Sequence, residues 1–385
     1  MGKKLLVILF LCLLLPGTAL AEQGSGSAAG VPDLNMAEVN KYIERLDSEI
    51  KSVVPEVNFK QLVYRIARNE VSFNPRDIAG GAASIVFREV VANWSLLGKL
   101  VVLAIICAVL QNLTSAFDRG STGQLSYMVT YLVLVTLAIG SFTLAVEAGR
   151  EVVDRMVIFM QAILPVLLTL LVAVGGFTAA AIYQPVVFVS ITLIATLIRN
   201  VVLPLILISA ILGLVSNLSP KFKVSNLAGL IRTVAMGLLG IMTTVFLGVL
   251  SIQGVAGAVG DSVLLRTAKF ATDAFVPVVG GMFSDALEAI VSSSLLIKNA
   301  VGIAGVIVVL SILVMPLLKI ICLALIYKLA GALIQPVEDG QIVSCLNDLG
   351  GSLMLVFAVV ATAGLLFFFT MTILVAVGNL TVMLR

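Results

Sequence analysis

The stretch SIQGVAGAVGDSVLLRTAKFATDAFVPVVGGMFSDALEAIVSSSLLIKNAVGIAG, from Ser251 to Gly305, gathers charge in the middle of an otherwise apolar chain. Hydrophobic sequence flanks it on both sides. The candidates for an interface or a hinge within it are Asp261, Arg266, Lys269, Asp273, Asp285 and Glu288. We interpret the stretch as the link between two membrane halves, with a charged turn from Asp261 to Asp273 and an interfacial helix from Pro277.

The composition of the whole chain excludes a soluble globular domain. Hydrophobic residues make up 60% of the 385 residues, charged residues 12%, and the mean hydropathy is +1.15. We therefore predict an all-α, polytopic helical membrane protein. At about 20 apolar residues per crossing, we expect roughly seven to ten membrane-embedded segments, some of them broken by proline. The small net charge of +3 and the lack of a dense Lys/Arg run argue against a nucleic-acid partner.

The chain contains no histidine, which removes His-based acid–base catalysis, the HExxH metal helix and the Ser-His-Asp triad. Its four cysteines show no CxxC or other ligand spacing. Cys107 and Cys322 are predicted to be small buried side chains and Cys345 to lie in a loop. The Gly-x-Gly-Asp pattern of an aspartyl intramembrane protease fails at Ala258. We expect a protein that is not an enzyme, with no catalytic residue, cofactor or metal site.

The N-terminal part has two predicted regions. Residues 1–21 have the basic start, short apolar run and small cleavage-site residues of a signal peptide, so we expect a mature N-terminus at Glu22, outside the cytoplasm. Residues 22–93 are predicted to be a small extramembrane helical region. Its expected amphipathic helices are residues 34–54, a short helix carrying Phe59, Leu62, Val63 and Ile66, and one that starts at Asn74–Pro75. This region either packs on the outer membrane surface or docks a partner protein.

Residues 94–150 are predicted to form a hairpin of two spans, from 96 to 113 and from 125 to 146. The rest divides into a first membrane half, residues 151–260, and a second membrane half, residues 261–385. Which end of each span faces the cytoplasm stays open, because positive charges lie on both sides of several spans.

Four prolines are predicted helix breaks, because proline removes a backbone donor: Pro165, Pro204, Pro277 and Pro316. The run from Ile182 to Leu218 would be about 55 Å long as one helix, against a hydrocarbon core near 30 Å, so we expect it to break near Pro204, tilt or project. The first and third prolines are 112 residues apart, and so are the second and fourth. This spacing suggests a weak repeat of one membrane half in the other; the alternative is coincidence.

Three basic residues, Arg199, Lys319 and Lys328, interrupt apolar runs and are candidates for facing a pore or the protein interior. The alternatives are structural ion pairs or snorkelling to the membrane surface. Asp285 and Glu288 share one helix face, where paired carboxylates bind a cation or relay a proton. An ordinary amphipathic helix at the membrane interface explains that pair more simply.

Several segments resemble the stage III sporulation protein AE family. In the central stretch they are Ser251–Gly254, Arg266–Phe270, Val276–Val278, Met282–Ala286 and Leu296–Gly302; elsewhere they are Gly175–Gly176, Gln184–Pro185, Asn200–Leu205, Ile326–Ala330, Gln335–Pro336 and Gly378–Asn379. The resemblance covers most of the chain and is specific in the central stretch.

The resemblance implies a polytopic protein in the mother-cell membrane around the forespore of an endospore-forming bacterium. It implies partners from the same operon, namely ring-forming subunits and an ATPase, in a channel complex similar to a secretion system. Two hypotheses follow. The first is a non-enzymatic subunit of that apparatus, and the second is an autonomous secondary transporter with proline-broken helices.

Overall fold

The protein is helical throughout the part that the structure describes. The computed structural model describes residues 58–67, 88, 91, 94–116, 121–218, 224–275, 280–336 and 340–383. In those residues every regular element is a helix. They are α3 Phe59–Ala67, α5 Trp94–Ala116, α6 Ser121–Ala173, α7 Phe177–Leu197, the π-helical turn η1 Ile198–Val202, α8 Leu203–Leu218, α9 Ser225–Phe275, α10 Gly280–Ile334 and α11 Gln341–Met383. The predicted all-α membrane fold is confirmed.

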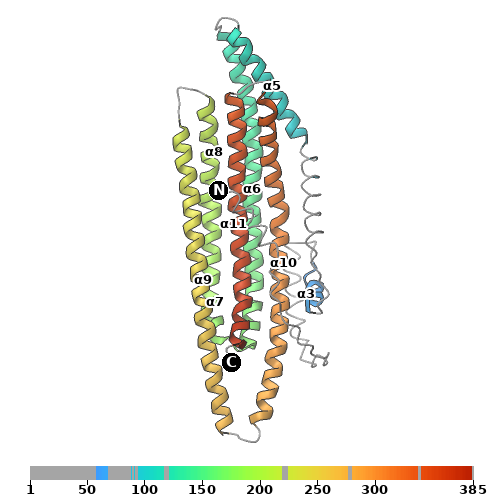
Figure 1. Cartoon of the computed structure of the whole chain (residues 1–385), viewed down its shortest axis with the longest axis vertical. Helices are drawn as coiled ribbons and strands as arrows, with labels where there is room; N and C mark the ends of the chain where they lie inside the picture. The colour runs from blue at the N-terminus through green and yellow to red at the C-terminus, as the bar shows by residue number, and fades with distance from the viewer. Residues whose placement is uncertain are drawn as a thin grey trace.

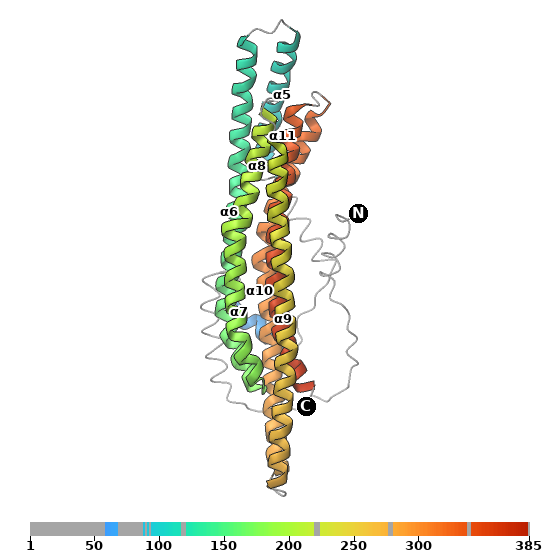
Figure 2. The same ribbon diagram turned by 90° about the vertical axis from the view of Figure 1, so that its left-hand side faces the viewer.

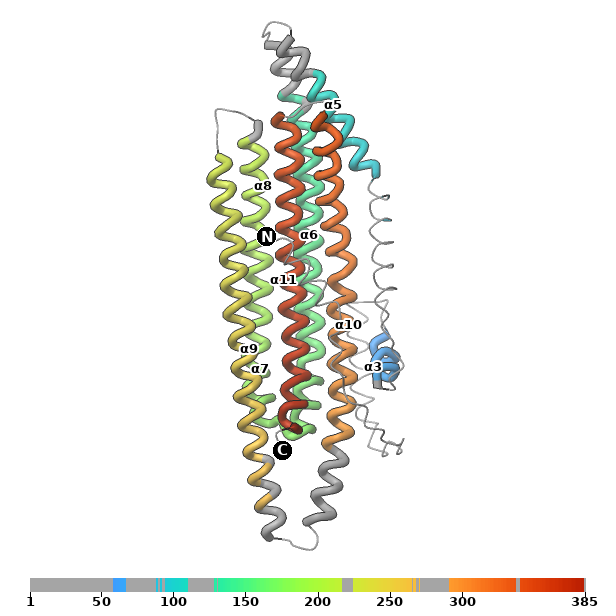
Figure 3. Tube along the Cα trace, viewed as in Figure 1, coloured from blue at the N-terminus to red at the C-terminus, as the bar shows by residue number. Residues whose placement is uncertain are grey.

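The long helices lie side by side in an elongated up-and-down bundle (Figures 1 and 2). Helix α7, η1 and α8 form one continuous rod beside α9, and Figure 3 traces the same path as a tube. Helix α11 packs against α6, α8, α9 and α10, and its inward side chains are buried along its whole length. The core is therefore organised around α11.

Five helices in the described residues are long and apolar enough to cross a membrane, and their candidate spans are 40 to 44 residues long. Helix α5 supplies a shorter apolar stretch, Trp94–Val109. Segments that we expected to be separate, such as residues 125–146 and the apolar run after residue 156, belong to the single helix α6. The described membrane part has fewer and longer helices than the expected seven to ten segments.

The prolines do not end helices where we predicted breaks. Pro165 and Pro316 lie inside the continuous helices α6 and α10, so the predicted breaks at these two positions are wrong. Pro204 follows a π-helical turn, and the chain remains helical on both sides of it. A membrane helix tolerates proline because a local π adjustment and neighbouring helices compensate for the missing donor. Pro277 lies outside the described residues.

The charged turn predicted from Asp261 to Asp273 is also wrong. Helix α9 continues through this segment to Phe275, and α10 begins at Gly280. The expected domain boundaries at residues 150/151 and 260/261 both fall inside helices, α6 and α9. Cys345, expected in a loop, is buried in the first turns of α11, while Cys107 and Cys322 are buried as predicted.

The sharpest described turn joins α6 to α7 through Gly175 and Gly176. Gly175 has a φ of 95°, which a side chain disfavours. The amide of Gly176 donates to the carbonyl of Leu171 at 2.9 Å, and that of Gly175 to Val172 at 2.8 Å. These bonds satisfy the last carbonyls of α6 and reverse the chain within three residues.

In the N-terminal region the structure describes one expected helix. Helix α3 carries the predicted apolar face, with Phe59 and Val63 buried and packed toward α10. Asn58 caps it, because its side-chain oxygen accepts from the amide of Gln61 at 3.1 Å. The predicted signal peptide, the helix over residues 34–54 and the helix from Asn74–Pro75 lie outside the described residues.

Candidate functional site

A belt of charge crosses the outer surface of the bundle halfway along α6. It consists of Glu147, Arg150, Glu151, Asp154 and Arg155 of α6 and Arg199 of η1, and we call these six residues the charge belt. The five α6 residues recur at helical spacing and therefore share one face of the helix. Three carboxylates and three guanidinium groups make the belt neutral overall.

Two ion pairs connect members of the belt. The Arg199 guanidinium donates to the Asp154 carboxylate at 3.1 Å, which joins η1 to α6, and Arg155 pairs with Glu151 one turn away. All four side chains are between 41% and 62% exposed. A cleft of about 480 Å³ lies against the belt, with Ile158 at its edge. The belt is thus an open polar surface and not a closed pocket.

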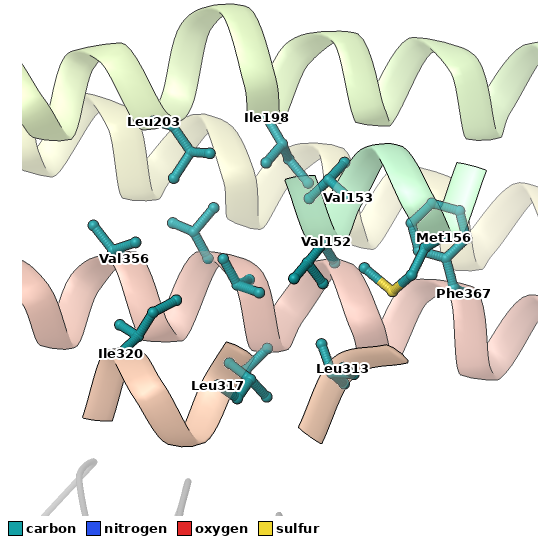
Figure 4. Packing of buried hydrophobic residues seen from close by; sticks show 14 of the residues in the cluster. Val152, Val153, Met156, Ile198, Leu203, Leu313, Leu317, Ile320, Val356 and Phe367 are labelled. Atoms are coloured by element: carbon teal, nitrogen blue, oxygen red, sulfur yellow. The ribbon is translucent and has the colours of Figure 1, made fainter. Parts of the chain in front are cut away.

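The same segment of α6 presents an apolar face to the core. Val152, Val153 and Met156 point inward, toward Ile198 of η1 and residues of α10 and α11 (Figure 4). Because these side chains fill the interior, the charged ones between them are directed outward. The backbone stays helical across the charged segment for the same reason.

The π-helical turn presents Arg199 at the surface. The amide of Leu203 donates to the carbonyl of Ile198, five residues earlier, and Pro204 follows. One wider turn leaves Ile198 and Val202 buried while Arg199 and Asn200 are exposed. Such turns are frequent at functional sites, and here the turn coincides with an ion pair that joins two of the helices.

At the N-terminal end of α7, a buried carboxylate of α9 binds the backbone of the first turn. Both carboxylate oxygens of Asp261, on α9, accept hydrogen bonds from the first turn of α7: from the Thr178 amide at 2.6 Å and from the Ala179 amide at 2.9 Å. Asp261 is 1% exposed. A carboxylate at a helix N-terminus satisfies unpaired amides and interacts favourably with the helix dipole. Asp261 therefore acts as a cap supplied by a neighbouring helix.

Close approach of α7 and α9 makes this cap possible. A Cβ atom at Gly257 would lie 2.8 Å from the Cα atom of Ala179, and one at Gly254 would collide with the Tyr183 hydroxyl. That hydroxyl donates to the Leu250 carbonyl at 2.9 Å. Glycines at these two positions let the backbones of α7 and α9 approach each other closely.

Lys298 lies in the contact between α10 and α11. Its side chain is fully buried, and its Nζ donates to the Val375 carbonyl of α11 at 2.8 Å. A Cβ atom at Gly378 would occupy the position of the Lys298 amine, so the glycine provides the space for it. This is a buried cation on a backbone carbonyl, in a contact built from small residues.

The three basic residues predicted to face a pore or an interior lie on the outer surface of the single chain. Arg199, Lys319 and Lys328 are all exposed. Lys319 lies on α10 between the buried side chains of Leu317 and Ile320. The stem of Lys328 packs over Gly350. A pore or a protein interior that these residues face would therefore have to be formed outside this single bundle, together with other chains.

The hinge candidates do not form one site in the described residues. Asp261 is buried as the cap of α7, and Arg266 is exposed one turn further along α9. Lys269 and Asp273 lie in α9, and Asp285 and Glu288 in α10, with their side chains outside the described part. No group of three potential metal ligands occurs among the residues that were described.

Sequence reasoning missed three buried tyrosines that tie helices together. Each hydroxyl donates to a backbone carbonyl of another helix: Tyr131 to Leu214, Tyr183 to Leu250 and Tyr327 to Ala138. The signal that could have found them is a tyrosine within a long apolar segment, because its hydroxyl needs a hydrogen-bond partner there. Lys298 offers the same signal, because its amine also lies in an apolar segment and needs a hydrogen-bond partner.

Comparison with known proteins gives one consistent result. A family model described as stage III sporulation protein AE matches residues 57–378. Stage III sporulation protein AE of Bacillus subtilis (strain 168) is 37% identical over 394 aligned residues, which cover 98% of each chain. No solved structure matches.

Proposed function

Because the chain belongs to the stage III sporulation protein AE family, we propose that it is a non-enzymatic integral membrane component of a channel or secretion-like apparatus between mother cell and forespore. Family membership gives the chain a sporulation-specific role, and five long apolar helices make it a multi-pass membrane protein. The observation that carries the proposal is the match along almost the whole chain to a sporulation protein, joined to a fold made of long membrane helices.

The use of the charged groups supports a non-enzymatic role. Both carboxylate oxygens of Asp261 accept hydrogen bonds from backbone amides of α7, and the Asp154 carboxylate forms an ion pair with Arg199. Lys298 is enclosed between two helices. A catalytic acid, base or nucleophile must reach a substrate, and these groups are engaged in holding helices together.

The location and partners are part of the same proposal. The protein resides in the mother-cell membrane around the forespore, with its mature N-terminus outside the cytoplasm. It contacts the lipid bilayer, and it assembles with the ring-forming subunits and the ATPase of the stage III sporulation A operon. No nucleic acid takes part.

The described helices argue against the alternative function, an autonomous secondary transporter. It relied on helices broken by proline near the membrane midplane, as transporters use for substrate sites. Pro165 and Pro316 lie in unbroken helices, and only the π-helical turn before Pro204 departs from α-helical geometry. The described residues offer no unwound segment around which a solute site is built.

The test is assembly in sporulating cells. A tagged copy of the chain replaces the native gene, and membranes are solubilised in mild detergent after engulfment. We expect the ATPase and the ring-forming proteins of the same operon to co-purify with the tagged chain, and a deletion strain to stop before mature spores form.

A matched strain with a tag on an unrelated multi-pass protein of the same membrane controls for co-solubilisation. Purification of the chain without any of these partners, combined with uptake of a defined solute by the chain alone in vesicles, would favour the transporter.

A further inference from the structure

The longest helices are more than twice as long as the hydrocarbon core of a bilayer is thick. Helix α6 has 53 residues and α10 has 55. At 1.5 Å per residue these helices are about 80 Å long, against a core of about 30 Å. The whole bundle therefore does not fit into one bilayer without a steep tilt.

The charge belt divides α6 and the rod of α7, η1 and α8 into two parts, each of which is close in length to the hydrocarbon core of a bilayer. On the rod made of α7, η1 and α8, Arg199 lies about 33 Å from the start at Phe177 and about 28 Å from the end at Leu218. On α6, about 27 Å of charge-free helix follow Arg155. About 39 Å of charge-free helix precede Glu147 on the same helix. On α6 and on the rod of α7, η1 and α8, each side of the charge belt thus has roughly the length of one hydrocarbon core.

Both halves have surfaces that suit lipid. Phe188, on one side of Arg199, is 50% exposed, and Ile208, on the other side, is 47% exposed. Exposed hydroxyl groups on either side are bonded within their own helix: Thr136 to the Leu132 carbonyl and Thr192 to the Phe188 carbonyl. Such local bonds are what a polar side chain needs where no water is available.

The belt itself does not suit lipid. The four paired groups of the belt are between 41% and 62% exposed, Glu147 is exposed as well, and Arg150 is half-buried. A charge at the middle of a bilayer costs about 2.5 to 3.5 kcal/mol on the insertion scale unless it finds water or a partner. A group of charges of this size belongs where water or lipid headgroups reach it.

We infer that the charge belt lies at the surface of the bilayer, so that one half of the bundle is embedded and the other half projects from the membrane. The length match and the exposed charges point to this boundary. Because each half has an apolar face, these faces do not identify the embedded half, and the experiment below does. The inference goes beyond the proposed channel role and does not depend on it.

Fluorescence quenching by brominated lipids tests the boundary. The chain has one tryptophan, so W94F provides a background without tryptophan fluorescence. F188W and I208W are then introduced separately into that background. These two positions lie on the same rod, with nearly equal exposure, on opposite sides of Arg199. The full chain is reconstituted in phosphatidylcholine vesicles with brominated or ordinary acyl chains.

We expect one of the two tryptophans to be quenched about threefold or more relative to the other, because the bromines are confined to the hydrocarbon layer. The direction of the difference identifies the embedded half. Equal quenching of both positions, or quenching of neither, would overturn the inference. A second pair, L193W and V215W, is measured as well, so that a folding defect in one variant does not decide the result; these positions are 49% and 45% exposed.

Discussion

Asp261 is the residue whose structural role is most sharply defined. Its two oxygens accept from the Thr178 and Ala179 amides, and both bonds are lost in D261A. Loss of a helix cap costs about 0.5–2 kcal/mol, and amides left unpaired in a buried place add to that cost. We expect D261A to lower the thermal unfolding temperature in detergent, and D261N, which keeps one acceptor, to lower it less.

R266Q, at an exposed position of the same helix, is the control for D261A and should leave the unfolding temperature close to that of the wild type. If D261A unfolded at the wild-type temperature, the carboxylate would not be the cap that holds α7 to α9.

Glycines of α9 offer a paired comparison. G257A places a Cβ atom 2.8 Å from the backbone of Ala179, whereas a Cβ atom at Gly248 meets nothing within 4 Å. Alanine is favoured over glycine in a helix by about 1 kcal/mol, so G248A should be neutral or stabilising. We expect G257A to be destabilising, because α7 and α9 must separate. Thermal unfolding of both variants side by side is the measurement, and equal unfolding temperatures would contradict the close contact.

Lys298 is buried with a backbone carbonyl as its hydrogen-bond partner. Replacing buried ionic groups by apolar ones of similar volume is often neutral or stabilising by about 1–4 kcal/mol. K298M should therefore unfold at the wild-type temperature or above it. A spore yield that falls while stability is kept would assign the amine to function; a large loss of stability would show that the amine is structurally required.

At the residue scale, the sequence indicates that a residue packs closely or needs a hydrogen-bond partner, but it does not indicate which distant residue supplies that contact. Gly254 and Gly257 lie three residues apart on α9, and both stand at close contacts with α7. Asp261 was expected to be part of a hinge, but its partners Thr178 and Ala179 lie more than 80 residues away in the chain, and no local pattern announces such a cap. Only the three-dimensional arrangement brings the two helices together.

At the scale of elements, the ion pair between Arg199 and Asp154 joins η1 to α6. Both side chains are about half exposed, and exposed pairs contribute about 0.2–1 kcal/mol, so we expect R199L and D154L each to change stability only slightly. The exchange variant R199D/D154R should restore whatever R199D alone loses in spore yield. If R199D lowered the spore yield and R199D/D154R failed to restore it, the pairing of these two charges would not be what the yield depends on.

The lengths of the helices are the part of the fold that the sequence did not predict. Charged groups at Glu147 to Arg155 and prolines at 165 and 316 were expected to end helices. In the structure the charges lie on one outer face, and Val152, Val153 and Met156 keep the other face in the core (Figure 4). An outward charge leaves the backbone hydrogen bonds of its helix intact, so it does not mark an end.

At the scale of the whole molecule, composition alone predicted the class of protein, because 60% hydrophobic residues leave only a membrane fold. The resemblance of the central stretch identified the family, and the comparisons confirm it. In the described residues, the up-and-down order of the long helices that pack around α11 depends on contacts between distant segments, which one sequence does not contain.

The central claim is that this chain is a subunit of a passage between mother cell and forespore. The most direct measurement follows a small membrane-impermeant fluorescent tracer from the mother cell into the engulfed forespore, in a deletion strain and in the same strain complemented with this chain. We predict no transfer in the deletion strain and restored transfer after complementation. Undiminished transfer into engulfed forespores without the chain would contradict the account.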